Sequence, residues 1–175
     1  MNYQGKRWRT IWRQDDDSVG VIDQRLLPHE FKTLDLRTLE EAARAVTASA
    51  RAKIPIMLEP FMSDWVDGQI ANDTSADAVI TSIAIASGLG STSAYTWLKL
   101  PVTDDMERVM EAATLPTLLL GGDPGTAPEA TYASWARALA LPGVHGLVVG
   151  RTLLYPQDHD VAAAVDTAAA LVHGL

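Results

Sequence analysis

Cysteine is absent from this chain of 175 residues, which excludes disulfide bonds, thiolate metal sites and a cysteine nucleophile. A protein without disulfides suits a reducing compartment, and we expect a cytoplasmic location. The four histidines, His29, His145, His159 and His173, lack the short spacing with which a helix or turn presents two metal ligands. We therefore expect no metal and no other cofactor.

Long apolar runs and net positive charge are also lacking. The longest apolar stretches, 117–122 and 146–150, are as short as strands, whereas a membrane-spanning helix needs about 20 apolar residues. Residues 1–13 are basic, but no apolar segment follows them, so we predict no signal peptide. The formal net charge of −8 argues against nucleic acid or an anionic membrane as a partner. With 47% hydrophobic residues, the composition indicates a globular protein.

The charge is unevenly distributed along the chain. Residues 1–53 hold ten Lys and Arg against eight acids, a net charge of +2, whereas residues 54–175 hold four against fourteen, a net charge of −10. The change in charge falls where the pattern of expected elements also changes. This coincidence favours two segments of different origin.

The first segment, residues 1–37, has the pattern of a small antiparallel β-meander. Residues 7–13 alternate, with Trp8, Thr10 and Trp12 on one face, and a polar turn at 14–18 leads to a return strand at 19–23. A third short strand is expected at 32–36. We expect this segment to be structural, with its strands covering an otherwise unpaired sheet edge.

The rest of the chain, residues 38–175, alternates helices and apolar strands. Thr38 is expected to cap a helix that runs to Ala52, with Glu41 completing a capping box. Strands are then expected at 54–59, 94–100, 117–122 and 144–150, and helices at 75–87, 104–113, 128–141 and 160–173. Strands that are apolar on both faces and alternate with helices predict a parallel sheet covered by helices.

The predicted fold class is therefore α/β, with four βα units of a parallel half-barrel sheet and a short N-terminal antiparallel β element. Residues 38–175 are expected to pack as one domain. A complete eight-unit barrel usually takes about 250 residues, so only half of a barrel is expected here.

Lys99 is the lysine most suited to chemistry. It is the only lysine in residues 54–175 and lies near the C-terminal end of the strand expected at 94–100, where (βα)8 barrels place their active sites. An amine in apolar surroundings is more readily uncharged, and a free amine attacks a carbonyl carbon to form a Schiff base. The alternative is a lysine that reaches from a strand end into solvent. The pattern alone leaves both open.

Glu59 ends the strand before that of Lys99, at the same rim of the expected sheet. Neighbouring strands lie about 4.8 Å apart, so the carboxylate and the amine are expected to meet. The carboxylate would then transfer protons during Schiff-base chemistry. A purely structural ion pair is the alternative.

Glycines follow the last two expected strands, as Gly121-Gly122 and as Gly150 before Arg151. Exposed backbone N–H groups beside an arginine suit a phosphate group, and loops after the last strands of a barrel are a recurrent phosphate site. Paired glycines after a strand are also ordinary turn residues.

Three motifs in residues 54–175 carry a resemblance to a known family: SADAVITSIAIASGLGSTSAYTWLKLP, TLPTLLLGGDP and GLVVGRTLLYP. This stretch, about 70% of the chain, resembles the C-terminal half of class I aldolase barrels, strands five to eight, and especially bacterial aldolase-like proteins. The resemblance implies that Lys99 is the Schiff-base lysine and Glu59 an acid/base residue. It also implies that Gly121, Gly122, Gly150 and Arg151 belong to a site for a sugar phosphate.

Residues 9–46 resemble a different family. The stretch RTIWRQDDDSVGVIDQRLLPHEF followed by DLRTLEEAARAV is similar to the N-terminal segment of methylthioribose-1-phosphate isomerases. That family continues with Arg-Gly-Ala-Pro, where this chain has Arg51-Ala52-Lys53-Ile54-Pro55, so isomerase activity is not implied. The chain thus looks like a chimera joined near residues 38–50, natural or made by recombination.

Two functions follow from these resemblances. The first is a folded fragment or chimera without native catalysis, and the alternative is a class I aldolase-type lyase that acts only when two halves pair. The former barrel interior is expected to carry Met57, Tyr95, Trp97, Leu119 and Val149. Such a large apolar face predicts a homodimer or larger symmetric oligomer that buries it, unless the N-terminal meander covers it instead.

Overall fold

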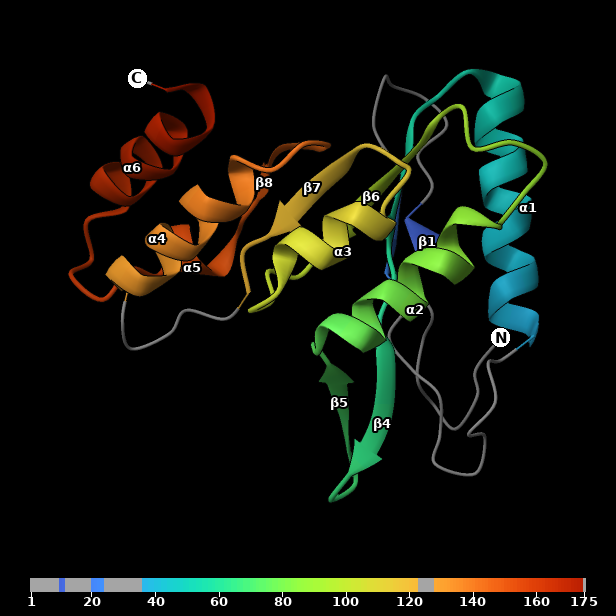
Figure 1. Ribbon diagram of the computed structural model, residues 1–175, viewed down its shortest axis with the longest axis horizontal. Helices are drawn as coiled ribbons and strands as arrows, with labels where there is room; N and C mark the ends of the chain where they lie inside the picture. Colours follow the sequence, from blue (N-terminus) through green and yellow to red (C-terminus); the bar gives the residue numbers. More distant parts are fainter. Residues whose placement is uncertain (1–9, 12–19, 24–35, 123–127, 175) are drawn as a thin grey trace.

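The computed structural model describes residues 10–11, 20–23, 36–122 and 128–174 (Figure 1). Most of the predicted N-terminal meander, including residues 32–35 of its third strand, lies outside the described residues. From residue 56 to the last helix, the four predicted strands and their helices occur in the predicted order, together with a β-hairpin and a short helix that were not predicted.

A six-stranded sheet organises the protein. Its strands follow the order β1-β2-β3-β6-β7-β8, and all neighbours are parallel except the antiparallel pair β1–β2. The strands are β1 (Thr10–Ile11), β2 (Gly20–Asp23), β3 (Ile56–Glu59), β6 (Thr96–Leu100), β7 (Thr117–Leu120) and β8 (Val144–Val148). The four strands predicted for the half barrel are therefore adjacent and parallel. This confirms the α/β fold class.

Five of the helices lie where the periodicity predicts them, with differences at their ends, and the short α5 (Arg151–Leu154) was not predicted. The five predicted helices are α1 (Leu36–Ala52), α2 (Ala76–Ser87), α3 (Met106–Ala112), α4 (Pro128–Leu139) and α6 (Val161–His173). The predicted cap at Thr38 is wrong, because α1 begins at Leu36 and Thr38 lies in its first turn. Leucine and arginine are strong helix formers, so Leu36 and Arg37 extend the helix backwards instead of ending a third strand.

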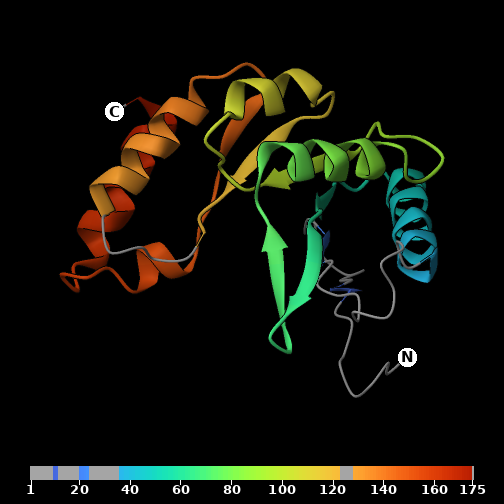
Figure 2. The ribbon, with the colours of Figure 1, turned by 60° about the horizontal axis from the view of Figure 1, so that its bottom comes forward.

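A β-hairpin between β3 and α2 was not predicted. β4 (Met62–Val66) and β5 (Gln69–Asp73) form a separate antiparallel pair that projects away from the main sheet (Figures 1 and 2). Its two-residue turn is Asp67-Gly68, with φ angles of 52° and 76°. Asp-Gly favours this left-handed turn, so the signal was present in the sequence.

The N-terminal segment extends the half barrel at one edge. β2 pairs in parallel with β3, with Gly20 in register with Ile56 and Asp23 with Glu59. The expectation that this segment covers a sheet edge is confirmed for β3. β8 is the last strand at the opposite end of the described sheet.

The hydrophobic core lies on one face of the sheet, which we call the helix face. Leu98, Leu100 and Leu119 are fully buried there against α1, α2 and α3, and Figure 2 shows α2 and α3 lying along this side. We call the opposite side, which carries Lys99, the inner face.

The expectation that Leu119 lies on the inner face is wrong. Lys99 is in register with Leu118, and Leu100 with Leu119, so β7 is offset by one residue from the simple count. Leu118 and Leu120 therefore share the face of Lys99. Val148, rather than the predicted Val149, is in register with Leu120 and joins them. Side chains alternate between the faces of a strand, so an offset of one residue exchanges the two faces.

Candidate functional site

Lys99 and Glu59 form an ion pair at the C-terminal ends of two neighbouring parallel strands. The Lys99 Nζ donates a hydrogen bond to the Glu59 Oε2 at 3.0 Å, and the side chains are 17% and 15% exposed. The register of β3 with β6 places these residues side by side, one step beyond the pair Leu58–Leu98. The predicted meeting of amine and carboxylate is thus present. Each group is accessible enough to meet a small molecule and buried enough to be held by its neighbours.

The inner face next to this pair is apolar and aromatic. Trp97 lies two residues before Lys99 on β6, and its ring meets the edge of the His145 ring with centroids 5.4 Å apart. Met57, the register partner of Trp97, is buried on the same face. Alternation predicts Trp97 on this face, but no sequence signal indicated His145. The contact requires Trp97 and His145 to reach across the intervening strand β7.

The backbone of the N-terminal segment reaches the same row of the sheet. Asp23 ends β2 and is in register with Glu59, which in turn lies beside Lys99. Asp23, Glu59 and Lys99 therefore lie in one row across three adjacent strands of the sheet, β2, β3 and β6. No sequence pattern indicated this alignment, because β2 and β3 are separated by a long stretch of chain.

The predicted phosphate residues lie on two loops that pack together. The Gly121 N–H donates to the Val148 carbonyl at 3.3 Å, and a Cβ atom on Gly121 would lie 2.5 Å from the Val149 side chain. Thr152 Oγ1 donates to the Gly121 carbonyl at 3.3 Å. Gly121 is thus required for close packing of the two loops, and its N–H is engaged inside the sheet.

The other predicted phosphate residues are more open. Gly122 has a φ of +69°, a left-handed conformation that favours glycine, and Gly150 and Arg151 are exposed at the start of α5. Gly122 follows Gly121, and Arg151 stands in the chain between Val149 and Thr152, two residues that contact Gly121. Across the described residues, no three His, Asp or Glu side chains are grouped so as to hold a metal ion. None of the described helices is long and apolar enough to cross a bilayer.

Comparison with known families matches one profile along most of the chain. The profile described as Cgl0159-like matches residues 10–169, a range that includes the predicted junction at 38–50. The crystal structure of Cgl0159 from Corynebacterium glutamicum is 69% identical, with a TM-score of 0.76 over 78% of this chain. The aligned part is 46% of the C. glutamicum chain, so this chain spans about half the length of that relative.

Two other comparisons concern the aldolase and isomerase resemblances. A Schiff-base-forming fructose-1,6-bisphosphate aldolase is 24% identical, with a TM-score of 0.64 over 78% of this chain and 52% of its own, which shows a shared fold. Methylthioribose-1-phosphate isomerase from Rhodospirillum centenum is 48% identical over 58 residues, 33% of this chain and 16% of the isomerase. The local isomerase match is therefore real, and it covers only a small part of that enzyme.

Proposed function

Because the chain belongs to the Cgl0159-like family, we propose that it carries the lysine-bearing half of a Schiff-base aldolase-type site. In this proposal the chain captures a small carbonyl compound on Lys99 but has no native turnover by itself. The observation that carries it is the 3.0 Å contact of Lys99 with Glu59 at the C-terminal rim of the parallel strands. The Schiff-base-forming aldolase that shares the fold supports the same chemistry.

The chemistry requires a nucleophile and a proton carrier. The Lys99 amine, once it has given a proton to the Glu59 carboxylate, attacks the carbonyl carbon and forms a carbinolamine. The carbonyl oxygen takes one proton from the attacking nitrogen and becomes the carbinolamine hydroxyl. Glu59 then returns its own proton to that hydroxyl, which leaves as water, and the nitrogen, which keeps its second proton, is joined to the carbon as a protonated imine. The direct hydrogen bond between the two groups makes this exchange geometrically feasible before any substrate arrives.

Carbon–carbon cleavage requires more than the described residues provide. It needs a substrate held in one orientation and a further acid/base group at the cleaved bond. The chain spans 46% of the C. glutamicum protein, so in this proposal the remaining groups come from barrel strands that have no counterpart here. Gly122, Gly150 and Arg151 would hold the phosphate end of a sugar phosphate bound in a complete site.

Borohydride trapping with dihydroxyacetone phosphate tests carbonyl capture. Reduction fixes the imine, and peptide mapping locates it. We expect label on Lys99, no label there in Lys99→Met, and slower labelling in Glu59→Gln. Lys53→Met is the matched control, since Lys53 is exposed and lies outside the site. Label on Lys6, Lys32 and Lys53 without label on Lys99 would refute the proposal.

The second candidate is a class I aldolase-type lyase formed when two halves pair. The inner face supports it, because Trp97, Leu118, Leu120 and Val148 remain only half-buried in a single chain. In this version a homodimer or larger oligomer covers the inner face, with β8 as the available edge. Cleavage of a ketose bisphosphate that is lost in Lys99→Met and grows with protein concentration would favour the lyase. A monomer in sedimentation without cleavage would favour the half-site.

A composite origin is a separate proposal about the same chain. The local isomerase match and the change of net charge from +2 to −10 support two sources, joined near residues 38–50. Amplification of the coding region across this junction from genomic DNA tests it. A junction absent from the genome would indicate recombination in the laboratory, and a continuous gene shared by close relatives of the source would remove the proposal.

A further inference from the structure

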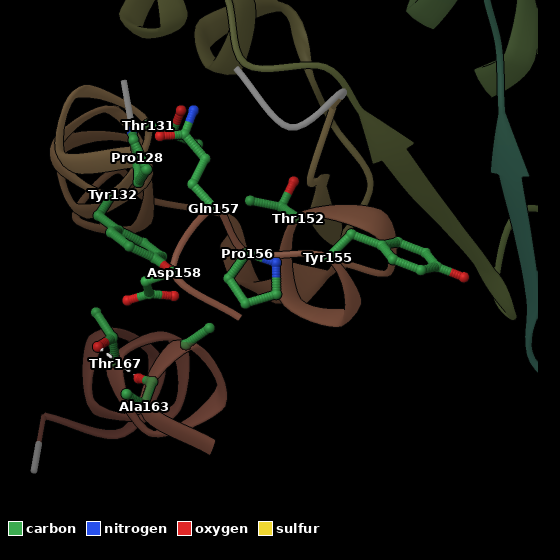
Figure 3. A pocket seen from close by; sticks show the side chains of 11 residues that line it. Pro128, Thr131, Tyr132, Thr152, Tyr155, Pro156, Gln157, Asp158, Ala163 and Thr167 are labelled. Atoms are coloured by element: carbon green, nitrogen blue, oxygen red, sulfur yellow. Dashed lines mark hydrogen bonds between the residues drawn. The ribbon is translucent and has the colours of Figure 1, made fainter. Parts of the chain in front are cut away.

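An open pocket lies outside the Lys99 site, between α4, the segment 152–158 and α6 (Figure 3). Its volume is about 250 Å³, enough for a small molecule. Neither Lys99 nor Glu59 lines it, and nothing in the Schiff-base proposal uses it. The walls combine an aromatic ring from α4, a carboxylate from the connecting segment and small side chains from α6.

The charge of the pocket comes from Asp158. No lysine, arginine or histidine is among the lining residues, so this carboxylate has no cation as a neighbour in the wall. The Asp158 Oδ1 accepts the backbone N–H of Asp160 at 3.1 Å, which holds the carboxylate in place. Figure 3 shows it between the ring of Tyr132 and the side chain of Thr167. Residues 54–175 carry a net charge of −10, and such a field attracts cations and repels anions.

The aromatic wall is the ring of Tyr132. Its edge-to-face contact with Trp135, with centroids 5.4 Å apart and an interplanar angle of 76°, fixes the ring against a buried residue. The face of an aromatic ring attracts a cation within about 6 Å of its centre. Pro156, Ala163 and Ala164 add apolar wall on the other sides, suited to methyl or methylene groups rather than to a hydrated ion.

We infer that this pocket binds a small organic cation, an alkyl or methylated ammonium compound, between Tyr132 and Asp158. The single carboxylate balances one positive charge, and the ring and the small side chains cover its methyl groups. A metal ion is a poor fit, because one carboxylate supplies too few of the six or more oxygen ligands that a hard cation takes. The negative charge of Asp158 repels an anionic ligand from the pocket.

The test uses choline as the probe and its neutral isostere, 3,3-dimethylbutan-1-ol, as the matched compound. Titration of the whole isotope-labelled chain is followed by amide chemical shifts. We expect choline to shift residues of α4 and α6 and to bind about tenfold more tightly than the isostere, because only choline carries the charge. Equal binding of the two compounds, or shifts elsewhere in the chain, would overturn the inference.

Variants assign the binding to the named residues. Asp158→Asn and Tyr132→Leu should each weaken choline about fivefold or more. Asp166→Asn is the control, since Asp166 is an exposed acid on α6 that does not line the pocket, and it should leave the affinity unchanged. An equal loss in Asp166→Asn would show general charge attraction and overturn the site. Lys99→Met should bind choline normally, so the outcome is independent of the Schiff-base proposal.

Discussion

The two faces of the same strands differ sharply in how they are covered. On the helix face, Leu98, Leu100 and Leu119 are fully buried against α1, α2 and α3. On the inner face, Trp97, Lys99 and Leu118 are only half-buried. Each βα unit brings its own cover for the helix face, whereas the inner face of a barrel is covered by strands from the other side.

This difference separates stability from chemistry along one strand. Along β6, buried side chains on the helix face alternate with half-buried side chains on the inner face. Lys99 is one of the half-buried side chains. A reactive group must be accessible to its substrate, whereas an apolar side chain stabilises the fold by being shielded from water. Substitutions on the two faces test whether this division holds.

Leu98→Ala and Leu118→Ala compare the two faces directly. Removing the fully buried Leu98 side chain should lower the free energy of unfolding by about 3–5 kcal/mol, since it leaves a cavity between sheet and helices. Removing Leu118 should cost about 1 kcal/mol, because the inner face is partly open. Urea unfolding followed by circular dichroism measures both. Equal losses would mean that the inner face is packed as fully as the core.

Lys99 and Glu59 should stabilise the fold only when both side chains are present. Lys99→Met leaves the Glu59 carboxylate, 15% exposed, without its partner, and we expect a loss of about 1–2 kcal/mol. The double variant Lys99→Met/Glu59→Gln should regain part of that loss, since the unpaired charge is gone. A cycle of four unfolding curves gives the coupling energy. A coupling energy near zero would mean that solvent screens the two charges from each other.

Thr96 offers a stabilising change on the helix face. Its hydroxyl is buried and has no hydrogen-bond partner among the described residues. Replacing it by the isosteric methyl in Thr96→Val should raise the free energy of unfolding by about 1 kcal/mol. Thr117→Val is the control, because the Thr117 hydroxyl donates to the Leu115 carbonyl at 3.1 Å. Destabilisation in Thr96→Val would reveal a partner for that hydroxyl.

Asp73, the last residue of β5 and two residues before the N-cap of α2, should give the smallest effect. The Ser75 backbone N–H, at 2.8 Å, and the Ser75 side chain donate to this carboxylate and hold its pKa below the ordinary 3.8. A lowered pKa stabilises the fold above about pH 4, and this contribution is lost as the pH falls through the folded-state value.

Melting temperatures of the parent chain and of Asp73→Asn check this sign. The difference should be present at pH 7 and should shrink toward pH 3. Asp67→Asn, in the turn of the same hairpin, is the control. A difference that grows on acidification would contradict the assignment.

Much of the fold was predictable because the hydrophobic periodicity of short stretches of sequence indicates the strands and helices. The alternation of apolar strands and amphipathic helices predicted four parallel strands and their helices, and the rim position of Lys99 and Glu59 followed from strand length. The β4–β5 hairpin was missed although Asp67-Gly68 is a strong hairpin signal. The pocket at Tyr132 and Asp158 was not predictable, since it is formed by elements whose spacing depends on tertiary packing.

The sequence by itself determined the alternation of the four half-barrel strands with their helices, and the position of one lysine beside one glutamate. Periodicity and residue type act within a few residues of chain, so these features need no knowledge of distant contacts. Only the tertiary structure decided that β7 is offset so that Leu118, not Leu119, lies beside Lys99, and that β2 runs parallel to β3. Register between strands is fixed by pairing across the sheet, and a shift of one residue there exchanges the faces of a whole strand.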